Sequence, residues 1–408
     1  MPARPLRLSR TAGFWVVTAT LTVLMAASAA PSPLFPVYEQ RWGVGPTAVT
    51  LVFAVYAATL LAALLTVGSL SDHLGRRPVV LAGVLGVVVA LALFVRADSV
   101  GWLLAARALQ GVGTGTAIGA LGAALLDLQR PGRQVAQLVN GAAPPVGLTL
   151  GALGSGLLVQ VGPAPTRLVY VVLAGLLVVA ALALWLLPAA AERVPGALAS
   201  LRPHVSVPAP TRPAMLRAAP AFIGSWALGG LFLSLGPSLA AQVLGRGDHV
   251  VGGLVVASVA GVGAVVGVLS RHRVPERVVA LGSAAFVLGP LLLVAALEQR
   301  STAGFFVGAV VSGVGFGAGF QGALRTVLGT APADQRAGVL AAVYVLSYLA
   351  FGLPAVVAGF LAPAVGLERA ADGYAGLVVV LGLVGLVLAA RARTVRARRP
   401  AGLDLPPA

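Results

Sequence analysis

Residues 68–83 read GSLSDHLGRRPVVLAG, and residues 267–282 repeat the stretch as GVLSRHRVPERVVALG at an offset of 199 residues. Seven of the sixteen aligned positions are identical, and the alignment needs no gap. Each copy confines its charges to a short loop between two long apolar runs, as expected where a tight turn joins two membrane-spanning helices. The chain is therefore predicted to be an internally duplicated membrane protein.

The composition predicts that most of the chain lies in lipid. The 408 residues are 58% apolar and 10% charged, and their mean hydropathy is +0.96. A helix needs about 20 residues to cross the hydrocarbon core. Runs of that length predict an all-α membrane protein with twelve transmembrane helices in two pseudo-symmetric six-helix bundles, at 13–35, 46–70, 79–96, 100–126, 134–160, 167–188, 217–242, 249–270, 277–297, 303–328, 337–362 and 373–392.

A shift in composition divides the chain. Residues 1–188 are expected to form the first bundle and residues 217–392 the second. Pro, Arg and Ser become frequent in 189–216, which is typical of a flexible-to-extended linker, here a cytoplasmic one. A basic cytoplasmic tail is expected at 393–408. The other loops are short and leave no room for a soluble catalytic domain.

The net charge of +16 results from 28 basic residues, all of them arginine, against 12 acidic residues. Most lie at the two termini and in alternate loops on one side, whereas the acidic residues divide evenly. This asymmetry predicts a multi-pass protein with both termini in the cytoplasm and a tail that contacts anionic membrane lipid, not nucleic acid. Arginine without lysine indicates a GC-rich genome, and we expect the bacterial plasma (inner) membrane. The absence of Cys excludes disulfides and thiolate chemistry.

The first loop combines glycines with charged residues at the ends of the two helices that it joins. Two glycines permit a tight turn and close helix approach, and charges of both signs lie at the helix ends, where they can pair with each other or with helix dipoles: Gly68, Gly75, Asp72, Arg76 and Arg77. These positions resemble the signature of the major facilitator superfamily between its second and third helices, although His73 departs from it. The resemblance implies a latch that closes the cytoplasmic side. The alternative is that the charges only set the topology.

The fourth span carries a second resemblance to that superfamily in RALQGVGTG, residues 107–115. The shared positions are Arg107, Gln110, Gly111 and Gly113. Arginine inside a membrane is costly unless it is paired or hydrated, so we expect Arg107 to lie inside the first bundle near the outer third of the span. Two roles are possible for it. One is hydrogen bonding to backbone at a helix break, and the other is direct participation in coupling or in substrate binding. Asp127 matches the acid that joins the loop arginines in the family, or is an exposed helix-end acid.

The fifth span reads NGAAPPVGLTLGALGSG over residues 140–156. It is similar to the Gly-Pro-x-x-Gly-Gly motif of the drug/proton antiporter branch, with Ala143 and Leu148 in place of two glycines. The resemblance implies antiport. A Pro/Gly kink that lets the helix bend is the other interpretation.

Polar and aromatic residues within the spans are candidates for lining a substrate cavity, although each could also serve helix packing. No Asp or Glu lies deep in any span, so the cavity is expected to be largely apolar and neutral to weakly cationic, which suits an amphipathic or anionic solute. A proton-coupled carrier also needs a titratable group, for which Glu39 and Asp127 are eligible. Arg41 follows Glu39 closely, which is also typical of a solvated loop acid. The cavity candidates are Ser28, Asn140, Trp226, Gln321, Tyr344, Ser347 and Tyr348.

Two equivalent halves with a cavity between them are typical of a transporter. We expect a monomeric secondary transporter that works by alternating access. It is expected to expel small apolar or amphipathic compounds, driven by the proton gradient. Uptake of a small polar or anionic metabolite is the alternative. No metal, cofactor or enzymatic activity is expected, because the four histidines lie in or beside loops and none pairs with an acid at metal-ligand spacing. A channel is disfavoured because the latch suits a gated cavity.

Overall fold

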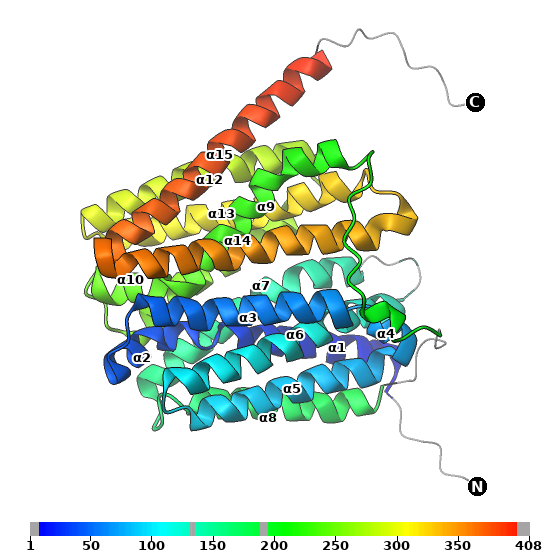
Figure 1. The fold of residues 1–408 in the computed structure, drawn as a ribbon, viewed down its shortest axis with the longest axis horizontal. Helices are drawn as coiled ribbons and strands as arrows, with labels where there is room; N and C mark the ends of the chain where they lie inside the picture. The colour runs from blue at the N-terminus through cyan, green and yellow to red at the C-terminus, as the bar shows by residue number, and fades with distance from the viewer. Residues whose placement is uncertain (1–7, 131, 133–134, 188–194, 398–408) are drawn as a thin grey trace.

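The computed structural model describes residues 8–130, 132, 135–187 and 195–397. Within them the chain is helical and contains no strand, and twelve helical segments are long and apolar enough to cross a membrane, as predicted. Residues 189–194 of the predicted linker and residues 398–408 of the predicted tail lie outside the described residues. Figure 1 shows two packed bundles with their helices running in a common direction.

The first bundle contains the helices before the linker. They are α1 (Arg10–Ala29), η1 (Ser32–Leu34), α2 (Phe35–Trp42), α3 (Pro46–Val67), α4 (Leu70–Leu74), α5 (Arg76–Arg96), α6 (Val100–Leu128), α7 (Val135–Val161) and α8 (Leu168–Trp185).

The second bundle follows a short helix of the linker, η2 (Ala199–Leu201). Its elements are α9 (Arg212–Ser234), α10 (Gly236–Gln242), α11 (His249–Leu269), α12 (Pro275–Glu298), α13 (Thr302–Leu328), η3 (Ala333–Gln335), α14 (Arg336–Val365) and α15 (Leu367–Ala397).

Helix boundaries differ from the predicted spans where proline or arginine overrides hydropathy. The span predicted at 13–35 is broken: α1 ends at Ala29, because Pro31 and Pro33 have no N–H with which to continue it. The span predicted at 217–242 likewise divides into α9 and α10. At the linker, α9 begins at Arg212 rather than 217, and α15 continues past 392 to Ala397. Arginine is a good helix former, so these helices extend beyond their apolar segments.

The two bundles meet along two helix pairs, α3 with α14 and α7 with α11. In Figure 1 the α3–α14 contact lies across the middle of the molecule. The short helices α2 and α10 lie at one end of the bundles and α4 lies at the other, beside the start of α1. We call these the α2–α10 end and the α4 end. Outer helices such as α8 expose large apolar side chains, including Val179 and Leu182, as lipid contact requires.

Small residues set the close approach of helices in both bundles. A Cβ atom at Gly317 of α13 would lie 2.8 Å from the Cα of Gly263 in α11, closer than real contacts allow. This is the packing that glycine permits between membrane helices. Gly175 of α8, by contrast, has no atom within 4 Å of its Cβ position.

We therefore expect Gly317→Ala to destabilise the protein by about 1–3 kcal/mol, since the backbones must move apart. Gly175→Ala should leave stability unchanged or raise it slightly, because alanine favours helix. Thermal unfolding of the two purified variants checks this pair. Equal unfolding temperatures would show that the α11–α13 contact is not tight.

Candidate functional site

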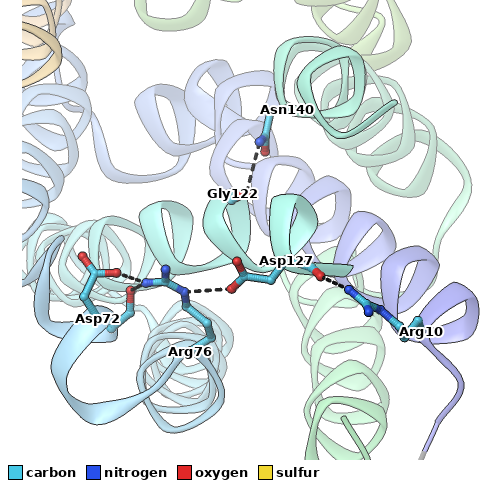
Figure 2. Close-up of polar contacts among 7 residues, drawn as sticks. Arg10, Asp72, Arg76, Gly122, Asp127 and Asn140 are labelled. Atoms are coloured by element: carbon cyan, nitrogen blue, oxygen red, sulfur yellow. Dashed lines mark hydrogen bonds and ion pairs between the residues drawn. The ribbon is translucent and has the colours of Figure 1, made fainter. Parts of the chain in front are cut away.

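Arg76 is the centre of a charged cluster at the α4 end (Figure 2). Its guanidinium forms ion pairs with Asp72 of α4 and with Asp127 of α6, and the Nε–Oδ2 distance to Asp127 is 3.2 Å. The same group donates to Ser71 Oγ over 2.9 Å. Arg10 at the start of α1 donates to the Asp127 carbonyl oxygen over 2.6 Å. One cation thus joins α4 and α5 to the end of α6, and Asp127 connects the cluster to α1.

Local backbone geometry brings the ions together. Gly75 separates α4 from α5 and has a φ of 94°, in the region that favours glycine. The turn places Arg76 at the first position of α5, where it faces back toward Asp72. The predicted charge cluster of Asp72, Arg76 and Asp127 is present in the structure.

Arg77 does not join the acids. Its guanidinium lies over the ring of Trp185 in α8, 4.6 Å from the ring centroid. The partners of the cluster also all come from the first bundle, so among the described residues it makes no ion pair with the second. The nearby connection out of the bundle is the hydrogen bond from Ser69 Oγ to the Ser200 carbonyl of η2, at 3.0 Å.

Arg107 lies inside the first bundle, where its side chain is only 1% exposed. It donates 2.9 Å hydrogen bonds to the Ser28 carbonyl and to Gln110 Oε1. Gln110 in turn donates to the Ala27 carbonyl over 2.8 Å, and Ser155 donates to the Ala30 carbonyl over 2.6 Å. These carbonyls belong to the last turn of α1, where a helix leaves acceptors without partners.

The break in α1 therefore explains why an arginine is buried here. The C-terminal end of a helix carries partial negative charge, which stabilises a cation without an acid. The ring of Tyr56 adds a second contact, with its centroid 5.0 Å from the guanidinium carbon. Gly113, six residues after Arg107 on α6, permits close packing on α5, because its Cβ would lie 2.7 Å from the Gly83 carbonyl oxygen. Of the two roles left open for Arg107, this geometry matches backbone bonding at a helix break.

The candidate cavity residues separate into two groups. Ser28 belongs to the Arg107 network, since it receives a 2.8 Å hydrogen bond from the Tyr56 hydroxyl. Asn140 donates to the Gly122 carbonyl over 3.2 Å, within the first bundle (Figure 2). The remaining candidates lie in the second bundle, on α9, α13 and α14: Trp226, Gln321, Tyr344, Ser347 and Tyr348.

Trp226 is the centre of a cluster of aromatic rings. Its ring centroid lies 4.6 Å from that of Tyr348, 5.4 Å from that of Phe351 and 5.8 Å from that of Phe320. Phe53 of α3 joins from the first bundle, 4.6 Å from Phe351. Sequence reasoning missed the three phenylalanines, although the i, i+4, i+7 spacing of residues 344, 348 and 351 could have indicated one aromatic face on α14.

Glu39 is not the solvated loop acid that its neighbour Arg41 suggested. It lies on α2 and is only 7% exposed. Its Oε2 atom accepts hydrogen bonds from Ser238 Oγ at 2.9 Å and from Gln242 Nε2 at 3.1 Å, both on α10 of the second bundle. Its Oε1 atom is buried without a partner. The two donors were not predicted, because neither stands out from other polar residues in the sequence.

Comparison with known proteins agrees with this architecture. A family model described as Major Facilitator Superfamily matches residues 17–299, more than half of the chain. The chain belongs to the Major Facilitator Superfamily. A search of curated proteins finds no match.

Several solved structures share the superfamily fold. The human organic anion transporter MFSD10 (TETRAN) is 19% identical with a TM-score of 0.64, over 93% of this chain and 100% of that one. A bacterial homologue of the human lysosomal transporter Spinster, inward-facing and unoccupied, is 14% identical with a TM-score of 0.73, over 96% and 99%. The nucleoside transporter NupG (D323A mutant) is 13% identical with a TM-score of 0.68, over 93% and 100%. As a superfamily member with transporter neighbours, the chain is a transporter rather than an enzyme.

Proposed function

We propose that the protein is a secondary transporter of the drug/proton antiporter-like branch. In this proposal it expels small apolar or amphipathic compounds across a bacterial plasma membrane by alternating access, as a monomer. The uneven distribution of arginine between the loops of the two sides supports a cytoplasmic position for the α4 end and for both termini, with the α2–α10 end outside. The boundaries proposed for the functional units are 1–188, 189–216, 217–392 and 393–408.

The position of Glu39 is the observation that supports the proposed coupling to protons. It is a buried acid at the contact between the two bundles, which is where a change of exposure accompanies opening. Among the described residues it makes no ion pair: α10 has no charged side chain, Arg41 on its own helix is exposed, and Arg246 in the following loop bonds to Thr302. Enclosing a carboxylate anion without a cation is costly, so a neutral Glu39 fits the closed α2–α10 end and an ionised one fits an open end.

This arrangement gives a proton cycle. Glu39 takes up a proton from outside when the end is open, the neutral form permits closure, and release of the proton toward the cytoplasmic side completes a turnover. Asp127, in the Arg76 cluster, is the second candidate for proton coupling and is tied to the opposite end. Movement of protons in pyranine-loaded proteoliposomes, on addition of a compound selected from a broad binding screen, tests the proposal. A compound that moves without any proton movement would contradict it.

The alternative proposal is uptake of a small polar or anionic metabolite. The observations that favour it are the buried cation Arg107, the lack of acids deep in the spans, and the organic anion and nucleoside transporters among the structural neighbours. Accumulation against loss of a labelled compound, in cells with and without the protein, separates the two directions.

The Arg76 cluster is proposed to act as a conformational latch of Gly68, Asp72, Gly75, Arg76, Arg77 and Asp127. Asp72→Asn should cost less than about 1 kcal/mol of stability, because the Asp72 side chain is 55% exposed. It should slow transport about tenfold, which corresponds to about 1.4 kcal/mol in the barrier. Thermal unfolding of the purified protein measures the change in stability, and transport rate per folded protein in proteoliposomes measures the change in rate.

Arg271 provides the matched control, since it occupies the position of Asp72 in the second repeat. It is exposed, and its side-chain bond is to the neighbouring His272. Arg271→Ala is expected to transport nearly as well as the parent protein. Similar losses in both variants would show that the two loops are mechanistically equal, against the latch proposal.

A further inference from the structure

We propose that the second bundle holds the substrate through an aromatic wall that selects planar, uncharged aromatic compounds bearing hydrogen-bonding atoms at their edge. The wall consists of Trp226, Phe320, Tyr348 and Phe351, completed by Phe53 of the first bundle. This inference rests on the transport role proposed above and specifies its substrate class.

The wall lies where the bundles meet. Its residues come from α9, α13 and α14 of one bundle and α3 of the other, and Trp226, Tyr348 and Phe53 are all well inside their helices. Gly352, next to Phe351, lies against Ala54 and Ala57 of α3. In a carrier with alternating access this interface is the part that rearranges, so a ligand between these rings is enclosed by one packing and released by the other.

The polar groups beside the rings lack partners. Among the described residues, the Trp226 indole N–H, the Tyr344 and Tyr348 hydroxyls and the Gln321 amide form no hydrogen bond, and Ser347 Oγ is buried without one. The tyrosines of the first bundle differ in this respect. Its three tyrosine hydroxyls are all bonded, Tyr38 to Tyr170 and Tyr56 to Ser28. Ser347 Oγ is buried, whereas Trp226, Gln321 and Tyr344 are only half-buried, so these groups are open to a ligand beside the packed rings. Polar groups that converge beside apolar rings are typical of a ligand site, and we infer that the ligand supplies their partners.

Helix α14 differs in aromatic content from its counterpart in the first bundle. Helix α14 carries Tyr344, Tyr348, Phe351 and Phe360, whereas its counterpart α7 carries no aromatic residue. The duplicated architecture therefore does not require rings here. A function specific to the second bundle accounts for them.

The charges on these helices lie away from the wall, which sets the charge of the ligand. Arg212 and Arg217 lie near the start of α9, Arg325 bonds to the Ser270 carbonyl near the end of α13, and Arg336 is the first residue of α14. No acid faces the rings from α9, α13, α14 or α3. The buried cation Arg107 of α6 is held by the Ser28 carbonyl and Gln110. An ionic ligand would therefore lose its hydration without a counter-charge from the wall helices, whereas a neutral flat ring gains aromatic contacts with Trp226 and Tyr348.

Binding of 2-naphthol to the full-length protein in lipid nanodiscs tests the inference, with decahydro-2-naphthol as the saturated match, 2-naphthoate and 2-naphthylmethylammonium as charged matches, and empty nanodiscs as the background. Calorimetry should show 2-naphthol binding about tenfold more tightly than its saturated match and more tightly than either ion. Trp226→Leu should remove most of that preference, Trp226→Phe should keep it, and Trp15→Leu, at an exposed site, should leave it unchanged. Tyr348→Phe should weaken naphthol binding with little change for naphthalene.

Equal affinity for the planar and saturated compounds, tighter binding of either ion, no binding of 2-naphthol, or a preference that survives Trp226→Leu would each overturn the inference. The assay needs no proton gradient, so it is independent of the coupling proposal. Naphthol discrimination without proton-linked transport would leave the wall in place and refute the antiport. Proton-linked transport of other compounds without such discrimination would support the antiport and refute the aromatic wall as the substrate site.

Discussion

Glu39→Gln is expected to abolish proton-coupled transport while leaving a folded protein that still binds its substrate. The substitution keeps the shape of the side chain and an oxygen that can accept from Ser238 and Gln242, so the contact between α2 and α10 stays intact. It removes the group that gains and loses a proton. Because the neutral side chain also favours closure, the variant should remain closed at this end.

Substrate-driven proton movement in pyranine-loaded proteoliposomes should fall to the level of empty liposomes. Asp98→Asn is the control, because Asp98 is an exposed acid in the α5–α6 loop at the same end of the bundle. It should retain the parental signal. Proton movement by Glu39→Gln at the parental rate would exclude Glu39 as the coupling site and direct attention to Asp127.

Arg107→Met should produce the largest loss of stability of the single substitutions considered. It removes the donor to the Ser28 carbonyl and to Gln110 Oε1, and each buried acceptor left alone costs about 1–3 kcal/mol, so we expect a total of about 2–6 kcal/mol. The α1 break should loosen, and with it the placement of α2 and Glu39. Arg107→Lys keeps the charge but not the planar fork of donors, so its stability should lie between that of the parent protein and that of Arg107→Met.

Thermal unfolding of purified protein, together with the amount inserted in the membrane, measures this effect. Arg96→Met is the matched control: Arg96 ends α5 and is exposed, so its loss should change stability by less than about 0.5 kcal/mol. An Arg107→Met protein with parental unfolding would show that the α1 carbonyls do not depend on the guanidinium.

Much of the fold could be predicted because membrane helices are specified by length and hydropathy. The twelve spans and the duplicated architecture follow from the apolar runs and the repeated loop. Burial of Arg107 followed from the cost of exposing arginine to lipid. The Asp72–Arg76 pair followed from the loop motif, because Gly75 imposes a turn that brings these charges together, and Asp127 was added by the resemblance to the superfamily. These are features that short stretches of sequence specify by themselves.

The contacts between the bundles could not be predicted. Helices such as α3 and α11 are apolar all round, so their sequences do not indicate which face meets the other bundle. For the same reason Ser238 and Gln242 could not be recognised as partners of Glu39, and Phe53 could not be assigned to the aromatic wall. The break of α1 could have been anticipated from Pro31 and Pro33. Its consequence, the capping of α1 carbonyls by Arg107, required the packing of α6 on α1.

The most direct test of alternating access controlled by Glu39 is the distance between the bundles at the α2–α10 end, measured by pulsed electron paramagnetic resonance. The chain has no native Cys, so spin labels can be placed at Gly45→Cys and Gly247→Cys, where a Cβ meets no atom within 4 Å. A second pair, Leu74→Cys and Val274→Cys, reports on exposed positions at the α4 end.

At acid pH the Gly45/Gly247 pair should give one short distance, as expected while the contact of Glu39 with α10 holds. At alkaline pH a longer distance should appear, because the ionised Glu39 favours the open end, and the Leu74/Val274 distance should shorten. In a Glu39→Gln background the Gly45/Gly247 pair should stay short at both pH values. An unchanged distance across pH in the parent, or the same response to pH in Glu39→Gln, would contradict the account.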